Sequence, residues 1–117
     1  MGGLTTHVLD TTRGRPAAGV VIELERRQGE TWQAVARAVT NADGRCDAPL
    51  LSAEGFVAGV YQLLFHVGAY FREAGGSAEA SPFLDVVPIR FALAADGGHY
   101  HVPLVVTPWS YSTYRGS

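Results

Sequence analysis

Alternation of apolar and polar side chains with a period of two predicts strands along most of the chain. In the segment 20–27, Val20, Ile22 and Leu24 alternate with residues of the opposite face, and the segment 59–67 repeats the pattern. Successive side chains of a strand point to opposite faces, so this pattern indicates strands that cover a core on one side. It predicts strands over 4–10, 20–27, 31–40, 59–67, 85–93 and 99–106, a short one after Pro108, and a brief edge strand near 48–51.

The same alternation assigns side chains to faces. One inward stripe is predicted in the segment 59–67, at Tyr61, Leu63, Phe65 and Val67, and another in the segment 85–93, at Val87, Ile89, Phe91 and Leu93. Pro88 then faces outward with Arg90, which suits an edge strand because proline has no N–H for a ladder. In the segment 31–40, one face is expected to carry Trp32, Ala34, Ala36 and Ala38.

Turn signals separate these strands. Asp43-Gly44 supplies the residue types that tight turns require, and 95–98 is expected to be a hairpin turn. Good helix formers over 69–74 predict one short helix that Gly75-Gly76 ends, followed by a loop over 77–83. Seven or eight short strands with one small helix indicate an all-β, two-sheet β-sandwich, formed as a single domain over residues 1–117.

Composition narrows the class of protein. Apolar residues make up 47% of the 117 residues and charged residues 17%, as in a folded globular domain. A net charge of −2 gives no basic field for nucleic acid, and the apolar runs are too short to span a membrane. Cys46 is alone, so no internal disulfide is available, and the first residues lack a signal-peptide pattern. We expect a cytoplasmic protein.

Two motifs lie near opposite ends of the chain. One is Leu4-Thr-Thr-His-Val-Leu-Asp10; the other is the terminal Tyr114-Arg-Gly-Ser117. Together they resemble the signatures of the 5-hydroxyisourate hydrolases, the transthyretin-related enzymes of purine breakdown, and the resemblance extends from residue 4 to residue 117. It implies a transthyretin-like sandwich, a homotetramer with sites between subunits, and no cofactor or metal.

The resemblance also implies a site. The family's catalytic residues match His7 in the first motif, Arg45 after the Asp-Gly turn and His101 in Tyr-His-Val-Pro-Leu. Tyr114 and Ser117 match positions that bind substrate together with His7 and Arg45. The implied reaction is hydrolysis of 5-hydroxyisourate to 2-oxo-4-hydroxy-4-carboxy-5-ureidoimidazoline.

These residue types suit that chemistry. Water must lose a proton as it attacks a ring carbonyl, and an unperturbed histidine, which titrates near neutrality, can accept it. Arg45 stays charged and offers a planar fork to a carbonyl-rich, anionic ring. His99 shares a strand face with His101, and we interpret it as a bystander at the mouth of the site. The sequence does not decide which of His7 and His101 is the base.

Two other functions are compatible with parts of the sequence. His99 and His101 on one strand face, with His7 as a third ligand, have the composition of a catalytic zinc site. A non-catalytic carrier like transthyretin would share the fold. Against the carrier, Tyr114 and Arg115 are bulky and polar where an open apolar channel requires small residues.

Overall fold

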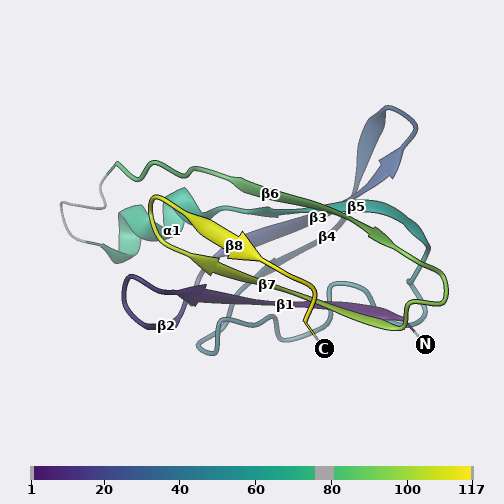
Figure 1. Cartoon of the computed structure of the whole chain (residues 1–117), viewed down its shortest axis with the longest axis horizontal. Helices are drawn as coiled ribbons and strands as arrows, with labels where there is room; N and C mark the ends of the chain where they lie inside the picture. The colour runs from purple at the N-terminus through teal and green to yellow at the C-terminus, as the bar shows by residue number, and fades with distance from the viewer. Residues whose placement is uncertain (1, 76–80, 117) are drawn as a thin grey trace.

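The computed structural model describes residues 2–75 and 81–116, and their strands form two four-stranded sheets (Figure 1). One sheet has the order β2-β1-β7-β8 and the other β4-β3-β5-β6. The elements in chain order are β1 (Gly3–Asp10), β2 (Arg15–Pro16), β3 (Val21–Gln28), β4 (Thr31–Val39), β5 (Gly59–Phe65), α1 (Val67–Ala74), β6 (Val87–Leu93), β7 (His99–Val106) and β8 (Tyr111–Thr113). This confirms the expected sandwich with one short helix.

The core lies between the inner faces of the two sheets. Val20, Ile22 and Leu24 are fully buried from one sheet, and Leu4 and Val8 from the other. Val20, Ile22 and Leu24 are the apolar members of the alternating pattern in the segment 20–27, so the inward face predicted there is confirmed. Burial of each large aliphatic side chain contributes about 1.5–3 kcal/mol, and this drives the sheets together.

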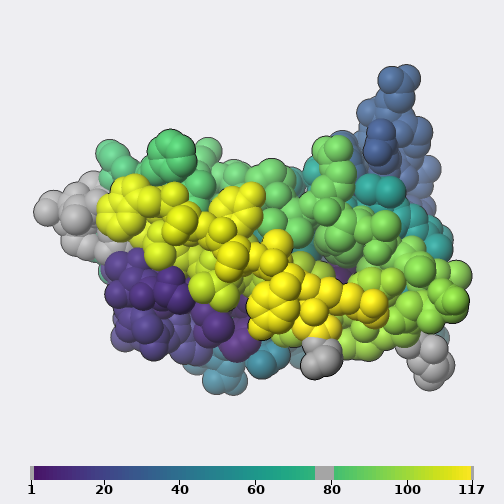
Figure 2. Space-filling model, viewed as in Figure 1, coloured from purple at the N-terminus to yellow at the C-terminus, as the bar shows by residue number. Residues whose placement is uncertain are grey.

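The β1–β7 pair joins segments far apart in the sequence. The two strands run parallel along their full lengths, from Gly3 opposite His99 to Asp10 opposite Val106. In Figure 2 the C-terminal residues lie across the same face of the molecule as the N-terminal strand. The first motif therefore forms β1, and Gly116 of the second motif bridges to His101 in the neighbouring strand β7 of the same sheet.

A β-bulge in β4 corrects one prediction. The register shifts between Leu24, which pairs with Ala36, and Glu25, which pairs with Ala34, so Val35 is an extra residue. A bulge reverses the alternation, because two residues of one strand oppose one residue of its partner. Ala36 therefore packs against the core while Ala34 is exposed on the outer side. The single face expected for Trp32, Ala34, Ala36 and Ala38 is wrong.

Three other details differ from the sequence prediction. Val67 is buried as expected, but as the first residue of α1 rather than the last of a strand. The segment 95–98 is a turn, yet it connects β6 in one sheet to β7 in the other, so it is not a hairpin. The expected edge strand near 48–51 is reduced to a single bridge between Leu51 and Leu4. The loop expected over 77–83 lies partly outside the described residues.

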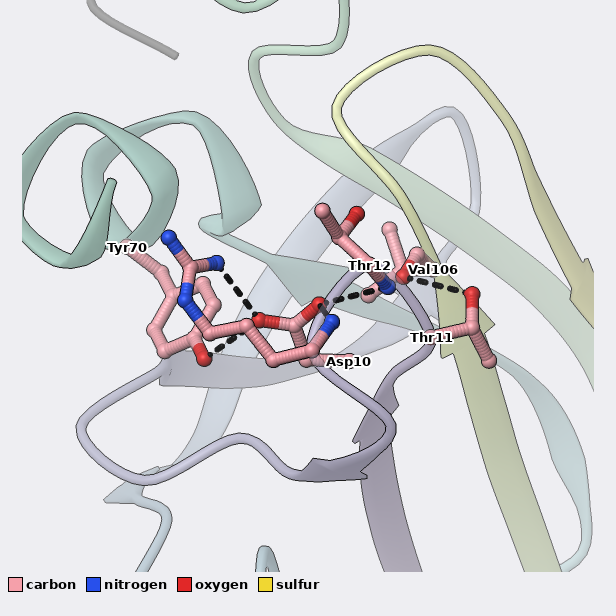
Figure 3. A network of polar contacts seen from close by, with 6 residues as sticks. Asp10, Thr11, Thr12, Tyr70 and Val106 are labelled. Atoms are coloured by element: carbon pink, nitrogen blue, oxygen red, sulfur yellow. Dashed lines mark hydrogen bonds and ion pairs between the residues drawn. The ribbon is translucent and has the colours of Figure 1, made fainter. Parts of the chain in front are cut away.

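The C-terminal end of β1 carries a buried charge (Figure 3). Asp10 has no exposed surface; it accepts hydrogen bonds from the hydroxyl of Tyr70 in α1 at 2.8 Å and from the guanidinium of Arg13 at 2.9 Å. Burial alone would raise the pKa of Asp10, but the bonds from Arg13 and Tyr70 outweigh it and hold that pKa below its usual value. The network fixes the helix to the end of β1.

Candidate active site

The candidate site lies on the outer face of the β2-β1-β7-β8 sheet. In the parallel register Thr5 lies opposite His101 and His7 opposite Pro103. Tyr100, Val102 and Leu104 point to the core, as their burial shows. His7 and His101 therefore stand on the same outer face of neighbouring strands, which the alternation along each strand predicts and the pairing confirms.

The Asp-Gly turn places Arg45 beside His7. Gly44 has φ of +73°, and its carbonyl accepts a hydrogen bond from the Val8 amide at 2.8 Å. A side chain at Gly44 would have its Cβ only 2.4 Å from the carbonyl oxygen of Val8, so only glycine permits this approach. The next residue, Arg45, forms an isolated bridge with His7. The turn is thus docked on β1 with the exposed guanidinium next to the histidines.

The charge of Arg45 influences both imidazoles. Burial lowers the pKa of His7, and the nearby Arg45 lowers it further, although Asp43 acts in the opposite direction. Burial likewise lowers the pKa of His101, followed by the effects of Arg45, His7 and His99. A lowered pKa keeps an imidazole neutral at neutral pH, and a neutral imidazole is the form that accepts a proton. The pair is suited to general-base chemistry.

A threonine hydroxyl joins two histidines of β7. Thr5 Oγ1 lies 2.9 Å from Nδ1 of His101 and 3.0 Å from Nε2 of His99. The sequence analysis did not single out Thr5. The available signal was its position two residues before His7, which places it on the same strand face. Its neighbours on β7 follow from strand pairing and cannot be read from β1 alone.

The C-terminal segment closes over His101. The amide of Gly116 donates to the carbonyl oxygen of His101 at 2.7 Å, and a Cβ on Gly116 would lie 2.9 Å from Cδ2 of that ring. The Arg115 guanidinium stacks on the ring of Tyr100 at 3.8 Å and donates to the carbonyl of Gly97 at 2.7 Å. Arg115 therefore anchors the segment on the neighbouring strand.

The other two expected substrate-binding residues are not part of this cluster in the described structure. Tyr114 is 62% exposed and borders an open groove of about 270 Å³ between β6 and the β7–β8 edge, lined also by Phe91 and Val102. Ser117 lies outside the described residues. The structure thus brings together His7, Arg45 and His101.

A small hollow lies beside the cluster, on the Arg45 side. It measures about 110 Å³ and is lined by Thr5, Thr6, Arg45, Cys46 and Ala48, but by neither His7 nor His101. Pockets for small molecules usually measure about 300–1,000 Å³. A larger cavity of about 360 Å³ lies beside α1, but its lining includes none of the candidate catalytic residues.

The zinc alternative is not favoured by this geometry. Within residues 2–75 and 81–116, no three His, Cys, Asp or Glu side chains lie close enough to share a metal ion. The hydroxyl of Thr5 bridges the ring nitrogens of His99 and His101 instead. The ligand set of His7, His99 and His101 that the sequence left open is thus not assembled in the described residues.

Comparison with known proteins places the chain in a family. Residues 4–116 match the model of the HIUase/Transthyretin family. The chain is 59% identical to the 5-hydroxyisourate hydrolase of Deinococcus radiodurans over 98% of this chain and 96% of that protein. Among solved structures, the 5-hydroxyisourate hydrolase of Klebsiella pneumoniae has a TM-score of 0.83 at 38% identity, with both chains fully covered. The transthyretin of Sparus aurata has a TM-score of 0.87 at 30% identity, covering 97% of this chain and 96% of that one. The chain belongs to the HIUase/Transthyretin family.

Proposed function

We propose that this protein hydrolyses 5-hydroxyisourate in urate breakdown and that His7, Arg45 and His101 carry the reaction. The observation that carries this proposal is the cluster of two histidines and an arginine on one outer sheet face. The chain is also nearly twice as similar in sequence to the Deinococcus radiodurans hydrolase as to the Sparus aurata transthyretin, at 59% against 30% identity.

The proposed chemistry is attack of water on a ring carbonyl. His7 or His101, neutral at working pH because its pKa is lowered, takes a proton from the water as the oxygen bonds to carbon. Negative charge then develops on the carbonyl oxygen, and the guanidinium of Arg45 stabilises it. Positioned proton transfer of this kind contributes about 10²–10⁴-fold to the rate.

We further propose that the site is completed between subunits of a homotetramer. The sheet ends at the three-residue strand β8, and aromatic side chains near this edge are exposed, with Trp109 at 59% and Tyr111 at 44%. Unpaired edges and exposed apolar side chains invite pairing with another copy. A neighbouring subunit would enlarge the 110 Å³ hollow, and Tyr114 and Ser117 would then reach substrate. The tetramer is tested by analytical ultracentrifugation.

The carrier alternative has less support. The groove at the β6 and β8 edge is bordered by Tyr114 and by Arg115, which is held over Tyr100. An apolar ligand in this groove would therefore contact these two bulky side chains. The expected cytoplasmic location stays a prediction, which cell fractionation would test; within the described residues no helix is long and apolar enough to cross a membrane.

The experiment follows the absorbance of 5-hydroxyisourate generated in place by urate oxidase. Wild-type protein should accelerate its decay, and His101→Ala should lower kcat at least about 100-fold, because a positioned acid–base group is lost. His66→Ala is the matched control. His66 directly follows β5 of the other sheet, and its Nε2 is hydrogen-bonded to the carboxylate of Glu23 at 2.7 Å. Unaccelerated decay with folded wild-type protein, or full activity of His101→Ala, would contradict the proposal.

A further inference from the structure

Thr5 has a place in the site that its residue type alone does not explain. Its hydroxyl lies within hydrogen-bond distance of two imidazoles, at 2.9 Å from Nδ1 of His101 and 3.0 Å from Nε2 of His99. The β1–β7 register, with Thr5 opposite His101 and Gly3 opposite His99, creates this arrangement. His99 can lie over the strand because Gly3 has no side chain; a Cβ there would be 3.1 Å from its Nδ1.

A hydroxyl has one proton, and this constrains both rings. Thr5 can donate to only one imidazole nitrogen, so it accepts from the N–H of the other. When His101 carries its proton on Nδ1, it donates to Thr5, and Thr5 donates to Nε2 of His99. In that state Nε2 of His101 has its lone pair free, as a base requires. In the opposite state, Thr5 donates to His101, whose proton then sits on Nε2.

We propose that Thr5 is the positioning residue that holds His101 in its base-ready tautomer, with His99 completing the hydrogen-bonded chain. This rests on the proposed hydrolysis for its catalytic meaning, though not for its geometry. His99 sets the direction of these hydrogen bonds. While its Nε2 is unprotonated, that nitrogen accepts from Thr5, and Nδ1 of His101 keeps its proton. The triad of serine proteases shows how strongly catalysis depends on the tautomer of a histidine.

The hydrogen-bonded series from His101 through Thr5 to His99 also gives a proton a route to solvent. As water attacks, its proton passes to Nε2 of His101. The Nδ1 proton of that ring moves to Oγ1 of Thr5, and the hydroxyl proton of Thr5 moves to Nε2 of His99. His99 is exposed and releases its Nδ1 proton to water, so charge and atoms balance along the chain. When the tetrahedral intermediate collapses, the ring C–N bond breaks and Nε2 of His101 gives its proton to the departing nitrogen. A proton then returns from water through His99 and Thr5 to Nδ1 of His101, which restores the starting tautomers.

Protonation of His99 reverses the donor and acceptor roles along this hydrogen-bonded series. A doubly protonated His99 ring donates from Nε2 to Thr5, which must then donate to Nδ1 of His101, and the base is lost. The charged or titratable groups near His101 are His7 on β1, Arg45 on the docked turn and His99 on its own strand, with Asp43 near His7. The tautomer of His101 therefore depends on the protonation of His99 as well as on the register that brings both rings to Thr5.

The kinetic test compares Thr5→Val, which keeps the shape but removes the hydroxyl, with Thr5→Ser, which keeps the hydroxyl. Thr5→Val should lower kcat roughly tenfold to a hundredfold while KM changes less than about twofold, because orientation is lost and binding is not. Thr5→Ser should stay within a few-fold of wild type. Thr11→Val is the matched control: Thr11 directly follows the same strand, and among the described residues its hydroxyl donates to the carbonyl of Val106, at 3.2 Å.

A second measurement needs no substrate. Two-bond ¹H–¹⁵N NMR spectra of protein labelled with ¹⁵N-histidine report which nitrogen of neutral His101 carries the proton. Wild type and Thr5→Ser should show the Nδ1–H form, and Thr5→Val a mixture or the Nε2–H form. Equal tautomers in all variants, or equal kcat for wild type and Thr5→Val, overturns the inference. If wild type itself fails to hydrolyse 5-hydroxyisourate, the proposed function fails, and the NMR result still decides the positioning.

The role of His99 is tested with His99→Gln. Its side-chain carbonyl can still accept from Thr5, so the two-bond NMR spectra of this variant should keep the Nδ1–H form of His101. A mixture or the Nε2–H form of His101 in His99→Gln overturns the part assigned to His99.

Discussion

Gly116→Ala tests the close approach of the C-terminal segment to His101. The added Cβ would lie 2.9 Å from Cδ2 of the ring and 3.5 Å from its Cβ and Cγ. Carbon atoms pack at about 3.5–4.0 Å, so either the ring or the segment must move by about 0.6 Å or more. On its other edge the ring is held by the hydrogen bond between Nδ1 and Oγ1 of Thr5, at 2.9 Å. The segment is held by the hydrogen bond from the Gly116 amide to the His101 carbonyl oxygen, at 2.7 Å.

The magnitude follows from the cost of misplacing a catalytic group. A displacement of about 1 Å can lower a rate about 100-fold, so a shift of about 0.6 Å should lower kcat about tenfold, or ~1.4 kcal/mol of activation free energy. The unfolding midpoint should change by no more than about 3 °C, because the segment can adjust at the surface.

The assay is decay of 5-hydroxyisourate, with oligomeric state checked by size-exclusion chromatography. Gly55→Ala is the control, because its added Cβ would have Ser52 Oγ as its nearest atom, at an ordinary 3.9 Å. The reasoning would be refuted by a Gly116→Ala variant that assembles like wild type and keeps its full kcat.

Three further predictions follow from the same geometry. Arg45→Gln removes a charge that lowers the pKa of His101, so the pKa of that ring should rise; NMR titration should show a midpoint at higher pH, and an unchanged midpoint would contradict the assignment. Tyr70→Phe removes one bond to buried Asp10 and should cost about 1.5 kcal/mol of unfolding free energy, or roughly 5 °C, by calorimetry at fixed protein concentration; a Tm equal to that of wild type would count against the network. Chelators should leave hydrolysis unchanged, whereas a loss that zinc restores would support the rejected metal site.

Much of the fold could be predicted because it depends on the alternation of side chains along single strands. The buried faces of β3 and β5 follow from alternation, and so does the shared face of His99 and His101. The bulge at Val35 could not be predicted, since it exists only in the pairing of β4 with β3. The turn after β6 has the same residue types whether the chain returns to its own sheet or crosses to the other.

The site was predictable to a similar extent. His7, Arg45 and His101 came from motifs, and the structure brings them together. The role of Thr5 depends on which residues of β7 lie opposite it, 94 and 96 positions away in sequence, and no local pattern specifies that register. Burial and the neighbouring charges that lower the histidine pKa values likewise arise only in the folded sheet.

The parallel pairing of β1 with β7 has a consequence for how the protein is made. A ribosome releases the first strand long before it synthesises the strand that lies beside it, so β1 must wait for nearly the whole chain. Closing so long a loop is slow compared with forming the β3–β4 hairpin, which requires only its neighbours. The sheet of β3, β4 and β5 can therefore form first, and activity is expected to appear last, in the same step that completes the second sheet.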